Sequence, residues 1–214
     1  MKKSILWILG VMSLVGSNYL YASIPLYSPP EGILLEFRPS YFNPTSSDFR
    51  ELFGSGTNYQ LTGTIPLCDG ADLWARGINL WVAVDYFTQN ARSSGLGSEI
   101  GIRMVPLTMG IKYFSPSTGG EIPVNFYGAA GMKYYFVHTY NNAPQVDHTI
   151  NQRGMGGVVE AGVIASITES LVLDIFSSYS AKTFKPPSLS NPAVEAKGLD
   201  VSGFNIGAGI GYEF

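Results

Sequence analysis

Residues 203–214 read GFNIGAGIGYEF, and their side chains alternate strictly between two kinds. One set of alternate positions is apolar or aromatic, namely Phe204, Ile206, Ala208, Ile210, Tyr212 and Phe214. The other set is small or polar, namely Gly203, Asn205, Gly207, Gly209, Gly211 and Glu213. Successive side chains of a β-strand point to opposite faces, whereas a helix would mix the two sets. The stretch therefore predicts a strand with one apolar face and one small or polar face.

The same alternation returns in seven further segments, which predicts eight strands in all. The expected strands cover residues 33–42, 58–65, 74–88, 101–114, 123–138, 155–167, 171–183 and 203–214. Short turns are expected near residues 67–72, 115–121 and 168–170, and longer polar loops near 44–57, 89–99, 140–153 and 185–200. An even number of strands, with short turns at one end and long loops at the other, is typical of outer-membrane barrels.

The composition restricts the class of protein. Charged residues make up 14% of the 214-residue chain, against about 25% in an ordinary soluble domain. Apolar residues at 45% and aromatic residues at 13% exclude intrinsic disorder. The net charge of −3 gives no electrostatic footprint for nucleic acid, so no nucleic-acid partner is expected. Two classes of protein remain: a soluble β-protein with few charged residues, and a protein embedded in lipid.

The N-terminus predicts export. Lys2 and Lys3 precede an apolar stretch at residues 5–15, which is the order found in secretory signal peptides. Cleavage is expected after Ala22, with Ser17 as the second site and an uncleaved anchor as the alternative. Residues 1–22 are then the signal peptide and residues 23–214 the barrel. No later apolar run reaches the roughly 18 residues that a transmembrane helix needs.

Most charges of the expected strands lie on the face opposite the apolar one. Seven of the eight strands carry one or two of them there, and acidic and basic groups nearly balance. Such a set suits an enclosed interior, where charges must be paired, better than a surface in water. We therefore predict that the apolar face meets lipid, and that a charge network lies in the lumen, formed by Glu36, Arg38, Asp85, Lys112, Lys133, Glu160, Asp174, Lys182 and Glu213. The alternative is a soluble lipocalin-like carrier with its apolar face inward.

Aromatic residues on the apolar face gather at the two ends of the strands. At the short-turn end they are Trp74, Tyr113, Phe126, Tyr212 and Phe214, and at the long-loop end Tyr41, Tyr86, Tyr134, Phe136, Tyr179 and Phe204. The ten-residue separation between Phe126 and Phe136 spans roughly 25 Å at a tilt of about 40°, which is the height of a lipid-facing band. Two aromatic girdles are therefore expected at the membrane interfaces. Arg76 breaks the alternation, and either snorkelling or a bulge would accommodate it.

With this pattern the chain resembles the small bacterial outer-membrane β-barrels of the OmpA, OmpX and OmpW type. The most specific element is the terminal set Ile210, Tyr212 and Phe214, which resembles the C-terminal signal read by the barrel assembly machinery. The resemblance covers essentially the whole mature chain but matches no particular subfamily. It implies an all-β, eight-stranded, antiparallel, up-and-down transmembrane barrel in the bacterial outer membrane. It also implies outer-membrane lipid and the barrel assembly machinery as partners.

The expected lumen leaves little room for a pore. An eight-stranded barrel is just wide enough to be filled by side chains, and bulky residues are expected inside it, namely Phe42, Trp81, Tyr127, Tyr135 and Phe176. The inward glycines of the last strand would leave space for them. A structural or surface-interaction role, with an extracellular ligand bound at the long loops, is therefore the first hypothesis. A narrow porin-like channel for small or apolar solutes is the alternative.

Enzymatic chemistry has little support in the sequence. A lipid A-modifying enzyme, the second alternative, needs a Ser or Asp arranged with a His. The chain has His138 and His148, and only His148 has an adjacent carboxylate, from Asp147. The glycines of the last strand have no helix after them, so they do not form a nucleotide loop. Cys68 is the single cysteine and cannot form an internal disulfide. We expect no catalytic residue, no metal and no cofactor.

Overall fold

The computed structural model describes residues 32–67, 77–92, 99–117, 123–141, 149–185 and 198–214. The proposed signal peptide and Cys68, Trp74, Arg76, Asp147 and His148 lie outside these residues. No helix in the described part of the chain is long and apolar enough to cross a membrane. The described elements are β1 (Leu34–Pro44), α2 (Ser47–Phe53), β2 (Gly56–Pro66), β3 (Ile78–Arg92), β4 (Glu99–Met104), β5 (Leu107–Phe114), β6 (Val124–Asn141), β7 (Thr149–Ser166), β8 (Leu171–Ala181) and β9 (Gly203–Glu213).

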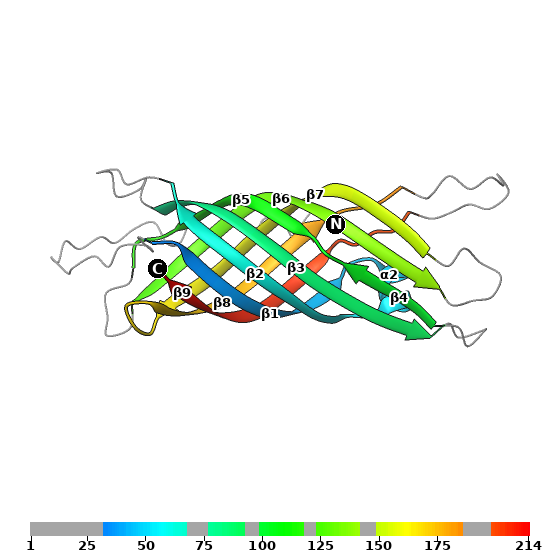
Figure 1. Cartoon of the computed structure of the whole chain (residues 1–214), viewed down its shortest axis with the longest axis horizontal. Coiled ribbons are helices and arrows are strands. Elements are labelled where there is room, and N and C mark those ends of the chain that lie inside the picture. Colours follow the sequence, from blue (N-terminus) through cyan, green and yellow to red (C-terminus); the bar gives the residue numbers. More distant parts are fainter. Residues whose placement is uncertain (1–31, 68–76, 93–98, 118–122, 142–148, 186–197) are drawn as a thin grey trace, which may run out of the picture.

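The strands form a closed antiparallel barrel (Figure 1). Neighbours in the chain pair with each other, and the last strand returns to the first, so that Leu34 lies opposite Glu213. Closure removes the free edges that an open sheet would expose. The tilt of the strands around the barrel axis is plain in the figure. The predicted all-β, up-and-down architecture is confirmed.

β4 and β5 are two halves of one strand. From Met104 to Leu107 the partner on β3 moves from Phe87 to Val84, so the register is unchanged across the break. The register against β6 is unchanged as well. Pro106 lies in the break and has no amide hydrogen, so it cannot complete the ladder. Counted in this way the barrel has eight strands, as the alternation predicted.

Several strands extend further toward the long-loop end than predicted. β6 continues to Asn141 and β7 begins at Thr149, so part of the expected loop at residues 140–153 is a paired hairpin. β3 likewise reaches Arg92, inside the expected loop at residues 89–99. Backbone pairing maintains these extensions although their side chains lose the apolar alternation.

The first long loop contains a helix that the sequence interpretation missed. Ser46 caps α2, with its hydroxyl accepting a hydrogen bond from the amide of Phe49 at 3.3 Å, and Gly54 ends it with a φ of 72°. Phe49 and Phe53 lie one turn apart and are both buried. A seven-residue helix is too short to be stable alone. Its two phenylalanines stabilise it by packing into the mouth of the barrel.

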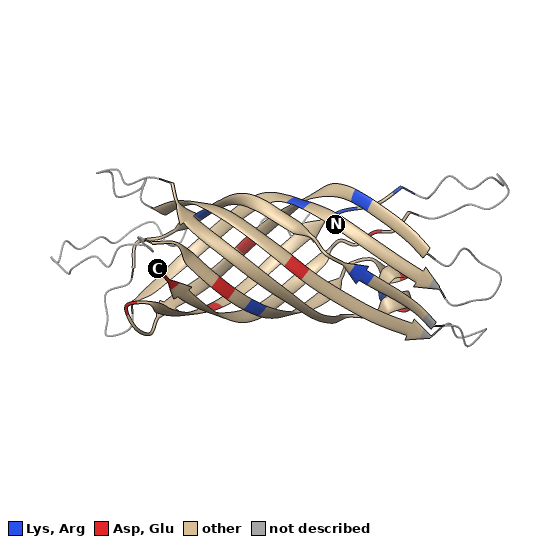
Figure 2. Ribbon diagram, viewed as in Figure 1, with Lys and Arg blue, Asp and Glu red and all other residues tan. Residues whose placement is uncertain are grey.

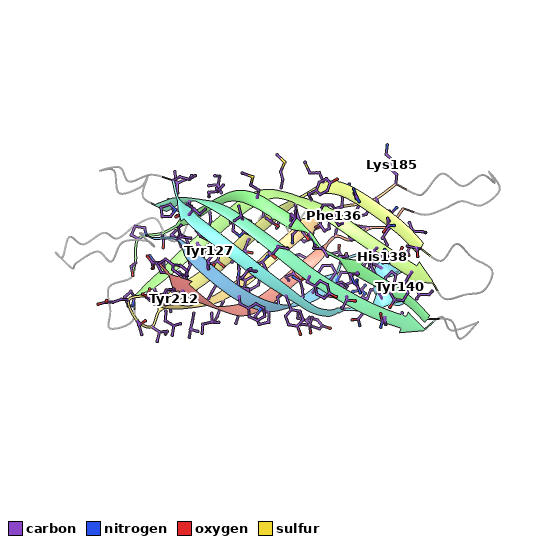
Figure 3. All side chains as sticks on the ribbon, viewed as in Figure 1. Tyr127, Phe136, His138, Tyr140, Lys185 and Tyr212 are labelled. Atoms are coloured by element: carbon purple, nitrogen blue, oxygen red, sulfur yellow. The ribbon has the colours of Figure 1, made fainter. Side chains whose placement is uncertain are left out.

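The wall has an apolar outer face. Burial alternates along β1 and β8 residue by residue, and large apolar side chains such as Phe37, Ile175 and Ile206 are about half to two-thirds exposed, at 49, 66 and 64%. Figure 3 shows such side chains projecting outward along the barrel, while Figure 2 shows few charged residues on its strands. A soluble carrier would have the opposite arrangement, with its apolar face turned inward.

The residues predicted for the aromatic girdles are on this outer face where the structure describes them. Tyr179 and Phe136 are half-buried. The others are exposed, namely Tyr41, Tyr86, Tyr113, Phe126, Tyr134, Phe204, Tyr212 and Phe214. Rings meet at both ends of the barrel: Tyr212 and Phe214 at 4.9 Å between centroids, and Tyr179 and Phe204 at 4.7 Å.

Candidate functional site

Seven of the nine charged residues predicted for the lumen lie buried inside the barrel, in two groups. The alternation of β1, β3, β5, β6, β7 and β8 points them inward. The set has four acids and three bases: Glu36, Asp85, Glu160 and Asp174, with Arg38, Lys112 and Lys133. Lys182 and Glu213 lie instead at opposite rims. They occupy the outermost inward positions, where the Lys182 ammonium lies 4.8 Å from the centre of the Phe184 ring and Glu213 accepts the amide of Gly32 at 3.2 Å.

Arg38 is the centre of the larger group. Its Nη2 donates to Oε1 of Glu160 at 2.8 Å and to the hydroxyl of Tyr127 at 3.0 Å. Its Nε lies 3.0 Å from Oδ2 of Asp174, and the Tyr127 hydroxyl donates to the same carboxylate at 3.0 Å. The guanidinium carbon is 3.7 Å from the centre of the Phe176 ring, which is a stacked cation–π contact. One side chain of β1 thus joins β6, β7 and β8 across the lumen.

Lys112 extends this group. Its Nζ lies 3.5 Å from Oε2 of Glu36 and 3.8 Å from Oε1 of Glu160. It also lies 4.4 Å from the centre of the Tyr127 ring. Three carboxylates therefore surround two cations in a region that is closed to solvent. Charges in such a place are tolerated only because each one has opposite charges or donors beside it.

Asp85 and Lys133 form the second group, nearer the long-loop end. Nζ of Lys133 lies 3.1 Å from Oδ2 of Asp85. The other oxygen, Oδ1, accepts hydrogen bonds from the side-chain amides of Asn58 and Gln60, each at 3.0 Å. This pair is neutral as a unit, and its acid has two amide donors on one oxygen and an ammonium beside the other.

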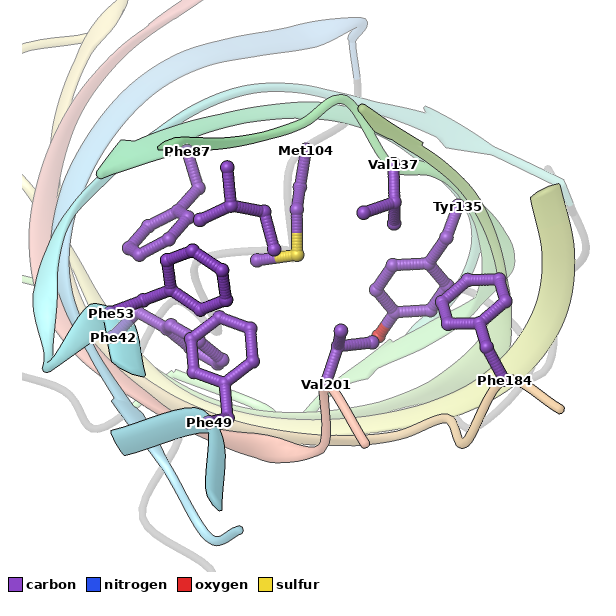
Figure 4. Close-up of a cluster of buried hydrophobic side chains, with 10 residues drawn as sticks. Phe42, Phe49, Phe53, Phe87, Met104, Tyr135, Val137, Phe184 and Val201 are labelled. Atoms are coloured by element: carbon purple, nitrogen blue, oxygen red, sulfur yellow. The ribbon is translucent and has the colours of Figure 1, made fainter. Parts of the chain in front are cut away.

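Apolar side chains close the lumen on both sides of these charges. The layer at the long-loop end (Figure 4) consists of Phe42, Phe49, Phe53, Phe87, Ile102, Met104, Tyr135, Val137, Phe184 and Val201. The layer at the short-turn end consists of Leu34, Phe114, Tyr127, Ile164, Val172 and Phe176. A cavity of about 20 Å³ lies between the long-loop layer and the Asp85–Lys133 pair, and Pro106 lines it. It has room for about one water molecule.

The bulky residues predicted for the lumen are inside. Of the inward glycines of β9, Gly203 leaves space for Phe42, whereas Gly209 and Gly211 leave space for charged side chains. A Cβ on Gly209 would lie 2.5 Å from Cγ of Arg38, and one on Gly211 would lie 2.7 Å from Cγ of Glu36. Trp81 is fully buried, and its indole nitrogen donates to the hydroxyl of Thr62 at 2.9 Å. The inward glycines are therefore a packing requirement of the charged layer.

The substitution Gly209→Val is expected to lower the free energy of unfolding by about 1–3 kcal/mol, because the new side chain overlaps the stem of Arg38. Urea unfolding in phospholipid vesicles measures the effect. The matched control is Ala208→Val, one residue away on the outer face, where the same bulk meets lipid. Equal decreases in the free energy of unfolding of the two variants would show that the inward glycines are not needed for packing.

Of the two histidines, His148 lies with its neighbour Asp147 outside the described residues, and His138 contacts an amide. His138 lies on the long-loop part of β6, and its Nδ1 is 2.8 Å from Oδ1 of Asn151 rather than from a serine or a carboxylate. Among the described residues, no group of three His, Cys, Asp or Glu side chains is placed to hold a metal ion.

Comparison with known proteins identifies the fold. No protein-family model matches the chain, and no curated protein matches its sequence. The crystal structure of Neisserial surface protein A is similar, with a TM-score of 0.52 and 17% identity over 86% of this chain and 98% of that one. The outer membrane protein OprG of Pseudomonas aeruginosa gives a TM-score of 0.56 and 16% identity over 88% and 99%. The chain has the fold of a small outer-membrane β-barrel. At these identities the likeness concerns the fold alone.

Proposed function

We propose that the chain is an exported protein of the bacterial outer membrane, and that its barrel is a closed, rigid scaffold that acts through its long-loop end. The observation that carries this proposal is the filling of the lumen. An apolar layer, a layer of ion pairs and a second apolar layer follow one another along the barrel axis. A barrel closed in this way supports binding at its rim better than diffusion through its centre.

Two further features support the membrane part of the proposal. The outer wall is apolar, with aromatic rings near both ends, which suits a lipid environment. Ile210 and Tyr212 on the last strand and Phe214 directly after it are all exposed. We propose that outer-membrane lipid covers the wall and that the barrel assembly machinery binds this terminal set during insertion. The signal peptide at residues 1–22 would direct export.

Planar-bilayer recording tests the closed lumen. The purified protein is expected to give no discrete, reproducible channel openings, because side chains fill every layer. The matched control is the double variant Tyr127→Ala/Phe176→Ala, which removes two rings from the lumen and is expected to conduct if it inserts. Openings in the unmodified protein at the frequency of the double variant would contradict the scaffold proposal.

A passage for small apolar solutes is the second candidate, and one observation favours it. The long-loop part of the lumen is lined by aromatic and aliphatic side chains, and the break between β4 and β5 at Pro106 adjoins the cavity below this layer. A solute entering from the long-loop end would meet apolar walls and then a weak point in the ladder. Entry of an apolar dye into vesicles that contain the protein, without ion conductance, would favour this candidate over the scaffold.

A further inference from the structure

A row of basic side chains crosses the outer wall at the long-loop end. Arg103 on β4 lies opposite His138 on β6, and His138 lies opposite Asn151 on β7. Arg153, two residues further along β7, lies opposite Phe136. Side chains on one face of directly paired or diagonal positions are close enough to act on one ligand. The strands β4, β6 and β7 therefore bring Arg103, His138 and Arg153 together as one patch, called here the cationic patch.

The cationic patch faces outward, not into the lumen. Ile102 and Met104, on either side of Arg103, are buried inside the barrel, and so is Val137 beside His138. Alternation then turns Arg103 and His138 to the outer face, and Arg103 is exposed. Figure 2 shows basic residues on β4 and β7 near this end, and Figure 3 shows His138 and Phe136 on the same strand.

The charges of the patch lack the acidic partners that the interior cations have. No described carboxylate lies within 4.0 Å of either arginine, whereas Arg38, Lys112 and Lys133 each have at least one. The guanidinium carbon of Arg153 lies 5.6 Å from the centre of the Phe136 ring. His138 is held through Nδ1 by Asn151, and its Nε2 has no partner among the described residues. The patch thus offers hydrogen-bond donors and positive charge to an anion from outside.

The height of the patch on the barrel indicates what that anion is. Arg153 is level with Phe136, a residue of the outer aromatic girdle. Arg103 and His138 lie two residues beyond it, which is about 5 Å along the axis of a tilted strand. An aromatic girdle marks the membrane interface, so the patch lies at the depth of lipid headgroups and faces the lipid rather than the space above the barrel.

We propose that the cationic patch binds the phosphate group of an anionic glycolipid of the outer leaflet. Guanidinium groups bind phosphate through paired, charge-assisted hydrogen bonds, and the imidazole adds a further nitrogen beside them. The acyl chains of the same molecule would pack on the aromatic girdle immediately below. The inference rests on the proposed outer-membrane location. It adds a ligand and a site that the closed scaffold alone does not require.

Native mass spectrometry of the full barrel in phosphatidylcholine nanodiscs, titrated with diphosphorylated lipid A, tests the proposal. Each basic residue near a membrane surface contributes about a fivefold gain in affinity for anionic lipid. The variant Arg103→Gln/Arg153→Gln is therefore expected to bind about thirtyfold more weakly than the unmodified protein, and each single variant about fivefold more weakly. Lipid A without its phosphates should bind both proteins equally weakly.

The matched control is Arg50→Gln, which removes the same charge from the exposed surface of α2 at the same end of the barrel. It is expected to leave the affinity unchanged. An equal loss in R50Q, an unchanged affinity in the double variant, or binding of inorganic phosphate in place of the lipid would each overturn the proposal. Heat-dependent gel mobility confirms that the variants are folded. Cell fractionation separately tests the outer-membrane location, so a failure of the location and a failure of the site are distinguishable.

Discussion

The substitution Arg38→Met is expected to lower the free energy of unfolding of the barrel by about 3–5 kcal/mol, because it leaves buried carboxylates without their cation. Glu160 and Asp174 lie 2.8 and 3.0 Å from the guanidinium, and all three side chains are closed to solvent. The loss is a large part of the roughly 5–15 kcal/mol that stabilises a typical folded domain. Urea titration in phospholipid vesicles, with folded protein read from its gel mobility, measures it.

A compensated variant separates charge from packing. Arg38→Met/Glu160→Gln/Asp174→Asn removes the cation together with both of its carboxylates, and leaves Lys112 paired with Glu36. Its stability is expected to return to within about 1 kcal/mol of the unmodified barrel, because no uncompensated charge remains. The surface control Arg50→Met should change the stability by less than about 0.5 kcal/mol. A triple variant as unstable as R38M would show that the ion pairs are not the reason for the loss.

The substitution Ile175→Lys is expected to lower the free energy of unfolding by about 2–4 kcal/mol, because it places a charge on the lipid-facing wall near the middle of the membrane. Ile175 is 66% exposed and pairs with Ala208, halfway between the aromatic residues that end β9. For a soluble protein, the same change at so exposed a position would alter the stability by less than about 0.5 kcal/mol. Urea unfolding in phospholipid vesicles measures the loss and distinguishes a wall in lipid, with about 2–4 kcal/mol, from a wall in water, with less than about 0.5 kcal/mol.

The control for this prediction is the same substitution at a different depth in the membrane. Tyr212 lies on the same outer face at the short-turn end. A lysine there reaches the interface, so Tyr212→Lys is expected to lower the free energy of unfolding by only about 0–1 kcal/mol. A cost at Tyr212 as large as the cost at Ile175, or a negligible cost at both positions, would contradict a wall that spans lipid between two aromatic girdles.

The strands could be predicted from the sequence because each wall residue meets one of two different environments. Lipid outside and paired charges inside impose a period of two, which is visible even in the last strand alone. Beyond the outer aromatic girdle the outer face meets polar headgroups and water instead of acyl chains, so the period disappears at residues such as Thr139 and Asn151, and the extended hairpin of β6 and β7 was not predicted. α2 was missed for another reason: its cap at Ser46 and its Phe49–Phe53 pair are helix signals, but the loop was interpreted from its polarity.

The partners inside the lumen could not be predicted, although the residues could. Alternation shows that Arg38 points inward, but the stagger of the strands around the barrel decides which inward groups lie at the same height. Arg38 on β1 meets Glu160 on β7 across the lumen, 122 positions apart in the chain. The same stagger leaves Lys182 and Glu213 at the rims. The cationic patch has the same origin, since Arg103 and His138 become neighbours only through the pairing of β4 with β6.

The central claim is that the apolar face of a closed barrel meets lipid, and spin-label accessibility along β8 tests it most directly. Single cysteines are introduced in a Cys68→Ser background and labelled in native outer-membrane vesicles. Labels at Leu173, Ile175 and Ser177 should collide often with oxygen and rarely with a water-soluble nickel complex, because these residues face outward. Labels at Ser178 and Ser180, which are buried in the lumen, should collide rarely with both. Frequent collisions of the nickel complex at the outward positions, or no alternation along the strand, would contradict the claim.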